Sequence, residues 1–189
     1  MAVSRMILSI MRRGALSEDA SYWRPVSKGA LAAGVLAAVA FWIHALTNKD
    51  GFLLLDYVNL PFHEFGHLFF GFFGEKIEIL GGTIMELLIP FGIFLSFFLR
   101  KETSGTAFSG FWFGENLLYI SVYIADARKM ELPLVGGGEH DWNIILSRLS
   151  MLQSDGTIAG IVKAFGWLIM VLSVMWFVVI GIKTGEKEE

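Results

Sequence analysis

Long runs of uncharged residues constrain this chain more than any other feature of its sequence. The first run, residues 29–46, is interrupted only by His44 near its end. A helix that crosses a bilayer needs about 20 mostly apolar residues, so this run has the length of a transmembrane helix. Further hydrophobic runs follow at residues 52–73, 83–99, 108–125 and 158–182. The pattern predicts an all-α integral membrane protein with about five transmembrane helices.

Composition supports a membrane protein and excludes several other classes. Hydrophobic residues make up 54% of the chain and charged residues only 17%, whereas soluble domains carry about 25% charged residues. The net charge is −3 and no long basic stretch is present, so we do not expect a nucleic-acid partner. The chain has no cysteine, which excludes disulfides and thiolate metal sites. A metal site here would need His, Asp or Glu ligands.

The chain divides into three segments of unequal size. Residues 1–28 form a basic N-terminal segment, residues 29–183 a single transmembrane domain, and residues 184–189 a charged tail. Five basic residues precede the first hydrophobic run. Because basic residues collect on the cytoplasmic side of a membrane, we expect a multi-pass protein with a cytoplasmic N-terminus.

A short segment after the second hydrophobic run has the pattern of a strand. Residues 76–79 alternate between polar and apolar side chains, and glycines bound the segment on both sides. Alternation with a period of two, enclosed by glycines, is typical of a short strand or hairpin. The sequence therefore predicts a short β-element in an otherwise helical protein.

The second hydrophobic run contains the motif HExxH, formed by His63, Glu64 and His67. Positions i and i+4 project from one face of a helix, so both imidazoles can reach one metal ion. Glu64 lies beside them and can act as the general base toward metal-activated water. Ionisable side chains are costly inside a membrane and are usually functional there. The motif therefore predicts a metal centre.

A catalytic zinc site usually has three protein ligands and one open position. Asp126 is one candidate for the third ligand, because it continues a polar stripe on the preceding helix. Glu115, Tyr119 and Asp126 lie at i, i+4 and i+11 of this stripe, with Val122 and Tyr123 between them. In a membrane such a stripe should face the interior of the helix bundle.

His140 is the second candidate for the third ligand. It follows the glycines 136–138, which allow a tight or re-entrant loop. Asp141 beside it can orient the imidazole, bind metal itself, or cap the following amphipathic helix. Glu86, in the third hydrophobic run, is a weaker candidate because a single buried Glu can instead bond to a neighbouring helix.

Three features make the chain similar to intramembrane zinc metalloproteases of the site-2 protease type. They are the HExxH at 63–67, Phe72-Phe73-Gly74 with the predicted β-element at 76–79 and Gly81-Gly82 behind it, and Asn116-Leu117-Leu118 leading to Asp126. No PDZ or nucleotide-sensing domain accompanies them. The chain therefore resembles a divergent, minimal branch of this group.

The resemblance implies that the chain hydrolyses a peptide bond within or near the bilayer. His63 and His67 would bind Zn²⁺, with Asp126 or His140 as the third ligand. Glu64 would be the general base, and Asn116 would hydrogen-bond the substrate. The predicted strand would pair with an unwound substrate. The implied partners are the lipid bilayer and a transmembrane or membrane-associated protein substrate.

A non-catalytic membrane protein is the competing interpretation. His63, His67, Asp126 and His140 together offer four ligands, enough for a closed structural or regulatory metal site with no open position. Coordination separates the two interpretations, because three protein ligands favour the enzyme and four favour the structural metal.

Overall fold

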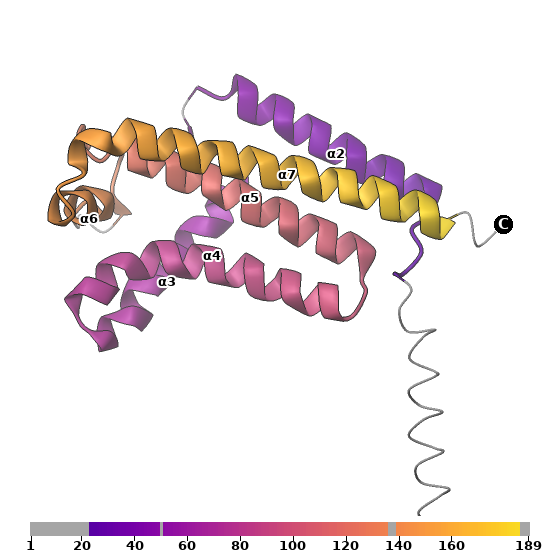
Figure 1. Cartoon of the computed structure of the whole chain (residues 1–189), viewed down its shortest axis with the longest axis horizontal. Coiled ribbons are helices and arrows are strands. Elements are labelled where there is room, and N and C mark those ends of the chain that lie inside the picture. The colour runs from indigo at the N-terminus through magenta and orange to yellow at the C-terminus, as the bar shows by residue number, and fades with distance from the viewer. Residues whose placement is uncertain (1–22, 50, 136–138, 186–189) are drawn as a thin grey trace, which may run out of the picture.

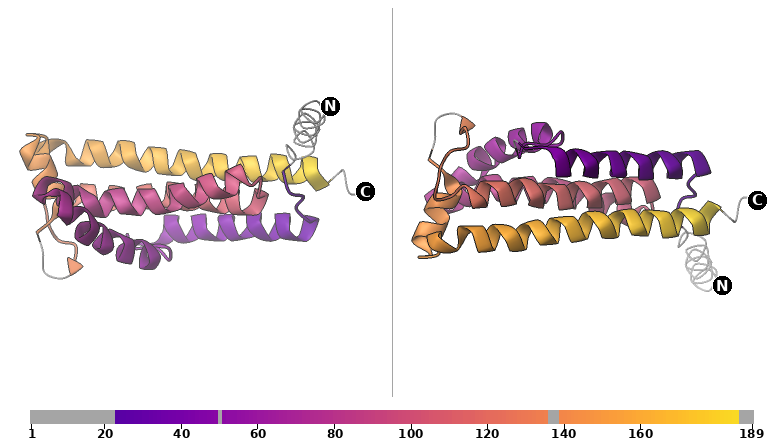
Figure 2. Two further views of the ribbon diagram at one scale, coloured as in Figure 1. Left: turned by 90° about the horizontal axis from the view of Figure 1, so that it is seen from below. Right: turned by 90° about the horizontal axis from the view of Figure 1, so that it is seen from above.

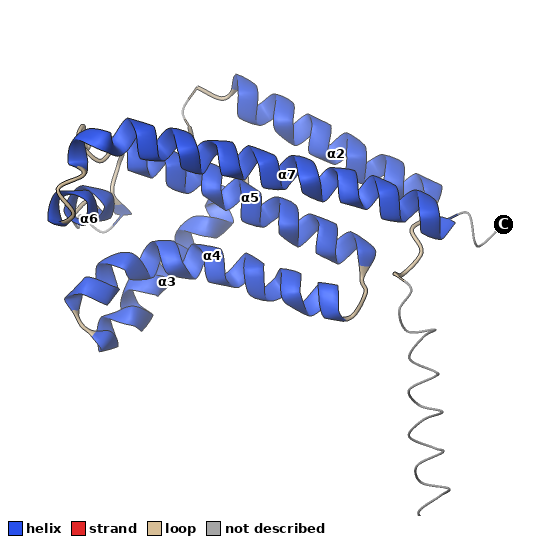
Figure 3. Cartoon of the chain, in the orientation of Figure 1, coloured by secondary structure: helices blue, strands red, loops and turns tan. Residues whose placement is uncertain are grey.

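The computed structural model describes residues 23–49, 51–135 and 139–185, and every regular element within them is a helix (Figures 1 and 3). The elements in chain order are α2 (Lys28–Thr47), α3 (Asp56–Phe70), the 3₁₀ turn η1 (Gly71–Phe73), α4 (Glu75–Leu99), α5 (Thr103–Ala125), α6 (Asp141–Arg148), the 3₁₀ turn η3 (Leu152–Ser154) and α7 (Asp155–Gly185). The predicted all-α class is confirmed for these residues. Most of the basic segment 1–28, the glycines 136–138 and most of the charged tail lie outside them.

Three of these helices are long and apolar enough to cross a membrane, not about five. They are α2, α4, and α7 together with η3. The run at 52–73 forms only the 15 residues of α3 and then η1. At 1.5 Å per residue α3 spans about 22 Å, less than the hydrocarbon core of about 30 Å. α5 has the length but carries several polar side chains, which are buried inside the protein.

The predicted β-element is wrong, because residues 76–79 form the first turns of α4. Gly74 precedes the helix with a φ of +98° and serves as its N-cap. Glu75 and Glu78 lie in the first turn, where the helix dipole favours negative charge. A strand with no partner would leave its backbone groups without hydrogen bonds, whereas a helix pairs them internally. An alternation over only four residues was too short to distinguish a strand from the first turn of a helix.

α5 is the central helix of the bundle, enclosed by α4 and α7 (Figure 1). It runs alongside α7, where two glycines bring the helices close together: a Cβ on Gly114 would lie 2.8 Å from the carbonyl oxygen of Gly166. Ile120, Ile124 and Met170 are buried at this contact. α2 packs along the outside against α7, and none of its own residues is buried.

α3 and α4 form a tight helical hairpin at one end of the molecule. A Cβ on Gly66 would lie 2.2 Å from the carbonyl oxygen of Gly81, so only glycine allows the two backbones to approach this closely. This contact fixes the face of α3 that carries His63 and His67 against the first turns of α4.

The two ends of the bundle differ in what they hold. α6 and the α3–α4 turn lie together at one end, whereas the chain leaves α7 and enters α2 at the other (Figure 2). At that other end the backbone N–H of Arg24 donates to the carbonyl of Lys101, 2.9 Å away. The first described residues are therefore tied to the α4–α5 turn, far from α6.

Candidate metal centre

Three potential ligand atoms converge between α3 and α6. Nε2 of His63 and Nε2 of His67 are 3.0 Å apart. Oδ2 of Asp141 lies 3.0 Å from the first and 3.1 Å from the second. His63 and Asp141 are buried, and His67 is partly exposed. Among the described residues, these three form the group whose ligand atoms are close enough to hold one metal ion.

The other nitrogen of each imidazole is turned toward an oxygen of α4. Nδ1 of His67 lies 2.8 Å from the carbonyl oxygen of Glu78, and because a carbonyl only accepts, this nitrogen donates. Nδ1 of His63 lies 3.3 Å from Oε1 of the buried Glu86. Carbonyl and carboxylate partners of this kind hold the ring orientation of metal-binding histidines. Glu86 therefore lies behind His63 and outside the group of three converging atoms.

When the rings are neutral and protonated on Nδ1, both Nε2 atoms are acceptors facing a carboxylate oxygen. Three acceptor atoms about 3 Å apart repel one another unless a cation or a proton lies among them. Bonds of about 2.0–2.1 Å in tetrahedral geometry separate ligand atoms by about 3.3 Å. The donor set of two imidazoles and one carboxylate, at the observed spacing, fits a zinc ion.

Gly82 of α4 makes room for the two imidazoles. A Cβ at this position would lie 2.6 Å from Cε1 and Nε2 of His63 and 2.7 Å from Nε2 of His67. Any side chain here would displace the rings from their present positions. In the sequence Gly82 follows the predicted strand and gave no sign of this contact, although a glycine inside an apolar helix often marks a close approach.

Residues around the start of α6 orient the side chain of Asp141 toward the histidines. His140, not Asp141, caps this helix, because its Nδ1 accepts from the backbone N–H of Asn143 at 3.3 Å. The carboxylate of Asp141 is therefore free of the capping role. The hydroxyl of Tyr123 accepts from the backbone N–H of Asp141 at 3.2 Å and lies 3.5 Å from its Oδ2.

The electrostatics of Asp141 suit a cation-binding site. Burial acts to raise the pKa of its carboxyl, but His63 and His67, when their rings are protonated and donate from Nε2, outweigh this effect and hold the pKa below its ordinary value. Asp141 is therefore ionised near neutral pH. Its charge is available to a metal ion at any pH where the histidines are deprotonated.

Asp126 and His140, the two residues proposed from sequence as third ligand, lie beside each other and outside this cluster. Oδ2 of Asp126 is 3.3 Å from Nε2 of His140. The carboxylate of Asp126 also accepts from the backbone N–H groups of Glu131 and Leu132 at 3.1 and 3.0 Å. These contacts fix the loop after α5 and the start of α6, so both residues hold Asp141 in place.

The polar stripe on α5 faces the interior, as predicted, but its members have different surroundings. Tyr119, Val122 and Tyr123 line a cavity beside His63. Glu115 is fully buried, and its Oε2 accepts from Asn59 at 2.9 Å. The stripe therefore runs from the bundle core to the metal centre.

Asn116, proposed from sequence to bind substrate, lies in the core. Its exposed fraction is 0%, and its amide donates to the carbonyl of Trp112 at 3.1 Å. It is not among the residues that line the two cavities at the cluster. The structure therefore does not bring Asn116 to the metal centre.

Glu64 lies in the wall of both cavities that flank the cluster. One cavity measures about 530 Å³ and the other about 340 Å³. His63, Glu64 and Tyr123 line both of them. The second also exposes His67 and Asp141. A molecule in the larger cavity would therefore meet His63 and the Glu64 carboxyl, and a molecule in the smaller one would meet all three residues of the cluster together with Glu64.

Asp141 is the site residue that sequence alone placed least well. It lies 74 positions after His67 (141 − 67) in the chain, and no local pattern predicts a contact over that separation. The signal available was an acidic residue next to His140 at the start of a predicted amphipathic helix. Comparison of the chain with protein families, with curated proteins and with solved structures found no match.

Proposed function

We propose that the chain is an intramembrane zinc metalloprotease that cuts a transmembrane or membrane-associated protein. The observation that carries the proposal is the convergence of His63, His67 and Asp141, whose ligand atoms lie 3.0–3.1 Å apart. A set of three protein ligands supports an open, catalytic position better than a closed structural site. The resemblance of the HExxH segment to site-2 proteases agrees with this assignment.

The chain supplies a proton acceptor and a substrate cavity for the reaction. Zinc, when bound, polarises the scissile carbonyl and lowers the pKa of water to about 7. The Glu64 carboxylate takes a proton from the water whose oxygen attacks the carbonyl carbon. It then delivers that proton to the amide nitrogen as the C–N bond breaks.

The membrane topology belongs to the same proposal. We infer that the protein passes through the membrane several times with its N-terminus in the cytoplasm. Because Arg24 is bonded to the α4–α5 turn, that turn shares the side of the N-terminus. The metal centre, at the opposite end of the bundle, would then face away from the cytoplasm.

Metal content tests the ligand assignment directly. The full chain is purified in detergent without chelators, and bound zinc is measured by mass spectrometry. We expect about one zinc per wild-type chain and its loss in both His67→Ala and Asp141→Ala. Asp126→Asn is the comparison variant and should retain zinc, because the amide keeps the size of the side chain and one oxygen that accepts from the loop after α5. Loss of zinc in Asp126→Asn with retention in Asp141→Ala would contradict the assignment.

Activity tests the catalytic part. Wild-type protein is incubated with a proteome-derived peptide library in micelles, and new termini are identified by mass spectrometry. Glu64→Gln should keep its zinc and lose cleavage by at least about 100-fold, as expected for a general base. If wild type and Glu64→Gln bind zinc alike and neither cuts, the site is a structural or regulatory metal centre.

A further inference from the structure

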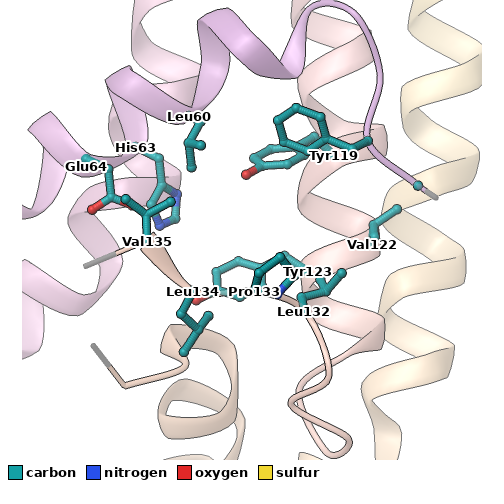
Figure 4. Close-up of a pocket in the computed structure, with 12 residues that line it drawn as sticks. Leu60, His63, Glu64, Tyr119, Val122, Tyr123, Leu132, Pro133, Leu134 and Val135 are labelled. Carbon is teal, nitrogen blue, oxygen red and sulfur yellow. The ribbon is translucent and has the colours of Figure 1, made fainter. Parts of the chain in front are cut away.

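The larger cavity beside the metal centre has a strongly apolar wall. It measures about 530 Å³, inside the range of about 300–1,000 Å³ that holds small ligands. Figure 4 shows its lining side chains projecting inward from α3, from α5 and from the loop before the glycines 136–138. The apolar side chains in this wall include Leu60, Val122, Leu132, Pro133, Leu134 and Val135.

This cavity opens directly onto the reacting groups of the proposed site. His63 and Glu64 form part of its wall (Figure 4). In an extended peptide, neighbouring residues lie only about 3.3 Å apart along the chain. A peptide whose carbonyl lies at the cluster therefore places the side chain next to the scissile bond at the mouth of this cavity.

The side chains that line the cavity determine which substrate side chains can bind in it. Away from the cluster its polar groups are the hydroxyls of Tyr119 and Tyr123, and Tyr123 already bonds to Asp141. Beyond Glu64 at the cluster, a charged side chain in this cavity would lose its water without gaining a partner of opposite charge, which is costly. A large apolar side chain would bury its surface at no such cost.

We propose that this cavity is the specificity pocket, and that the chain takes substrates with a large apolar side chain, such as Phe, Leu or Met, next to the cleaved bond. The proposal rests on the proposed function for the position of that bond. The predicted binding of an apolar side chain does not depend on the proposed function, because the cavity exists whether or not the bond is cut.

Leu60 is the position from which to test the pocket. It lies one helical turn before His63 and projects into the cavity (Figure 4). Leu60→Phe would reduce the space available. Leu68→Phe on the same helix is the matched control, because Leu68 is 73% exposed and lines neither cavity.

The first arm measures cleavage. Wild-type protein should enrich large apolar residues next to the cut bond in the peptide library. Leu60→Phe should shift kcat/KM by about tenfold toward smaller residues such as Ala and Val, the size of effect that small changes in an apolar pocket produce. Leu68→Phe should cut as wild type does. Enrichment of charged residues, or no shift in Leu60→Phe while cuts still depend on Glu64, would overturn the pocket alone.

The second arm measures binding without cleavage. Zinc-loaded Glu64→Gln protein is titrated with a fluorescent peptide that carries a single Phe among Ala and Ser, and with the same peptide carrying Lys in its place. The Phe peptide should bind at least about tenfold tighter, and adding Leu60→Phe should abolish the difference. Equal binding of both peptides, or a difference that Leu60→Phe leaves unchanged, would mean that lipid or detergent occupies the cavity and would overturn the proposal. Absence of cleavage with this binding preference intact would overturn the proposed function only.

Discussion

The geometry of the candidate metal centre depends on a residue with no side chain as much as on the three residues that could bind an ion. His63 and His67 come from one turn of α3, but their rings can meet Asp141 only because Gly82 leaves the opposite wall open. The second contacts of the rings, to the Glu78 carbonyl and the Glu86 carboxyl, also come from α4. The geometry of the ligands is therefore set largely by a helix that supplies none of them.

Gly82→Ala should weaken zinc binding by about 10–100-fold, the range seen when support around metal ligands is lost. The added Cβ would lie 2.6–2.7 Å from ring atoms of both histidines, so the rings must turn. Gly92→Ala on the same helix is the control, because nothing lies within 4 Å of the added carbon. Isothermal titration with zinc measures both. Equal affinity in the two variants would show that the rings do not depend on this wall.

Sequence predicted the part of the site that is local in the chain. His63, Glu64 and His67 fall within one helical turn and a fixed spacing, so their shared face follows from helix geometry. Asp141 reaches the two histidines only through the packing of α6, which no local pattern predicts. As a third ligand Asp126 had stronger support in the sequence, because it continues the polar stripe on α5. A stripe on α5 shows which face turns inward, but it does not show which inward residue lies opposite α3.

Helix α5 shows how an element can span the bundle without resembling a membrane span. It lies between α4 and α7, and residues such as Thr103, Ser109 and Asn116 are buried along it. Length and hydropathy predicted its helix correctly. They could not reveal that α4 and α7 bury much of its surface. The strand predicted at 76–79 was wrong for a related reason. A four-residue pattern says nothing about the backbone partners that a strand would need.

The close contact between α5 and α7 should be sensitive to one added methyl group. In Gly114→Ala the new Cβ would lie 2.8 Å from the Gly166 carbonyl oxygen and 2.9 Å from the Met170 nitrogen. Because both are backbone atoms, we expect a loss of about 1–3 kcal/mol of stability. Unfolding in detergent with increasing SDS measures it.

Gly160→Ala on α7 is the control for this prediction. The position has open space around it, so alanine should be neutral or stabilise the helix by up to about 1 kcal/mol. A Gly114→Ala protein as stable as Gly160→Ala would show that the α5–α7 contact tolerates separation.

The whole molecule places its metal centre at one end and its first described residues at the other. The chain contains no cysteine, so one introduced cysteine reports the side on which it lies. If the N-terminus is cytoplasmic, Glu131→Cys near the metal centre should react with a membrane-impermeant maleimide on intact cells. Arg100→Cys at the far end should react only after permeabilisation. The reverse pattern would contradict the proposed orientation.

The burial of α5 also governs how the protein can enter a membrane. An ionisable side chain near the middle of a lone helix raises its insertion free energy by about 2.5–3.5 kcal/mol, and Glu115 lies near the middle of α5. The transfer of this helix alone from the translocon into lipid would therefore be unfavourable in free energy. In a membrane it would need α4 and α7 beside it to shield Glu115 from lipid. If the protein inserts through a translocon, we expect a chain that stops before residue 155, and so lacks α7, to be retained there or degraded.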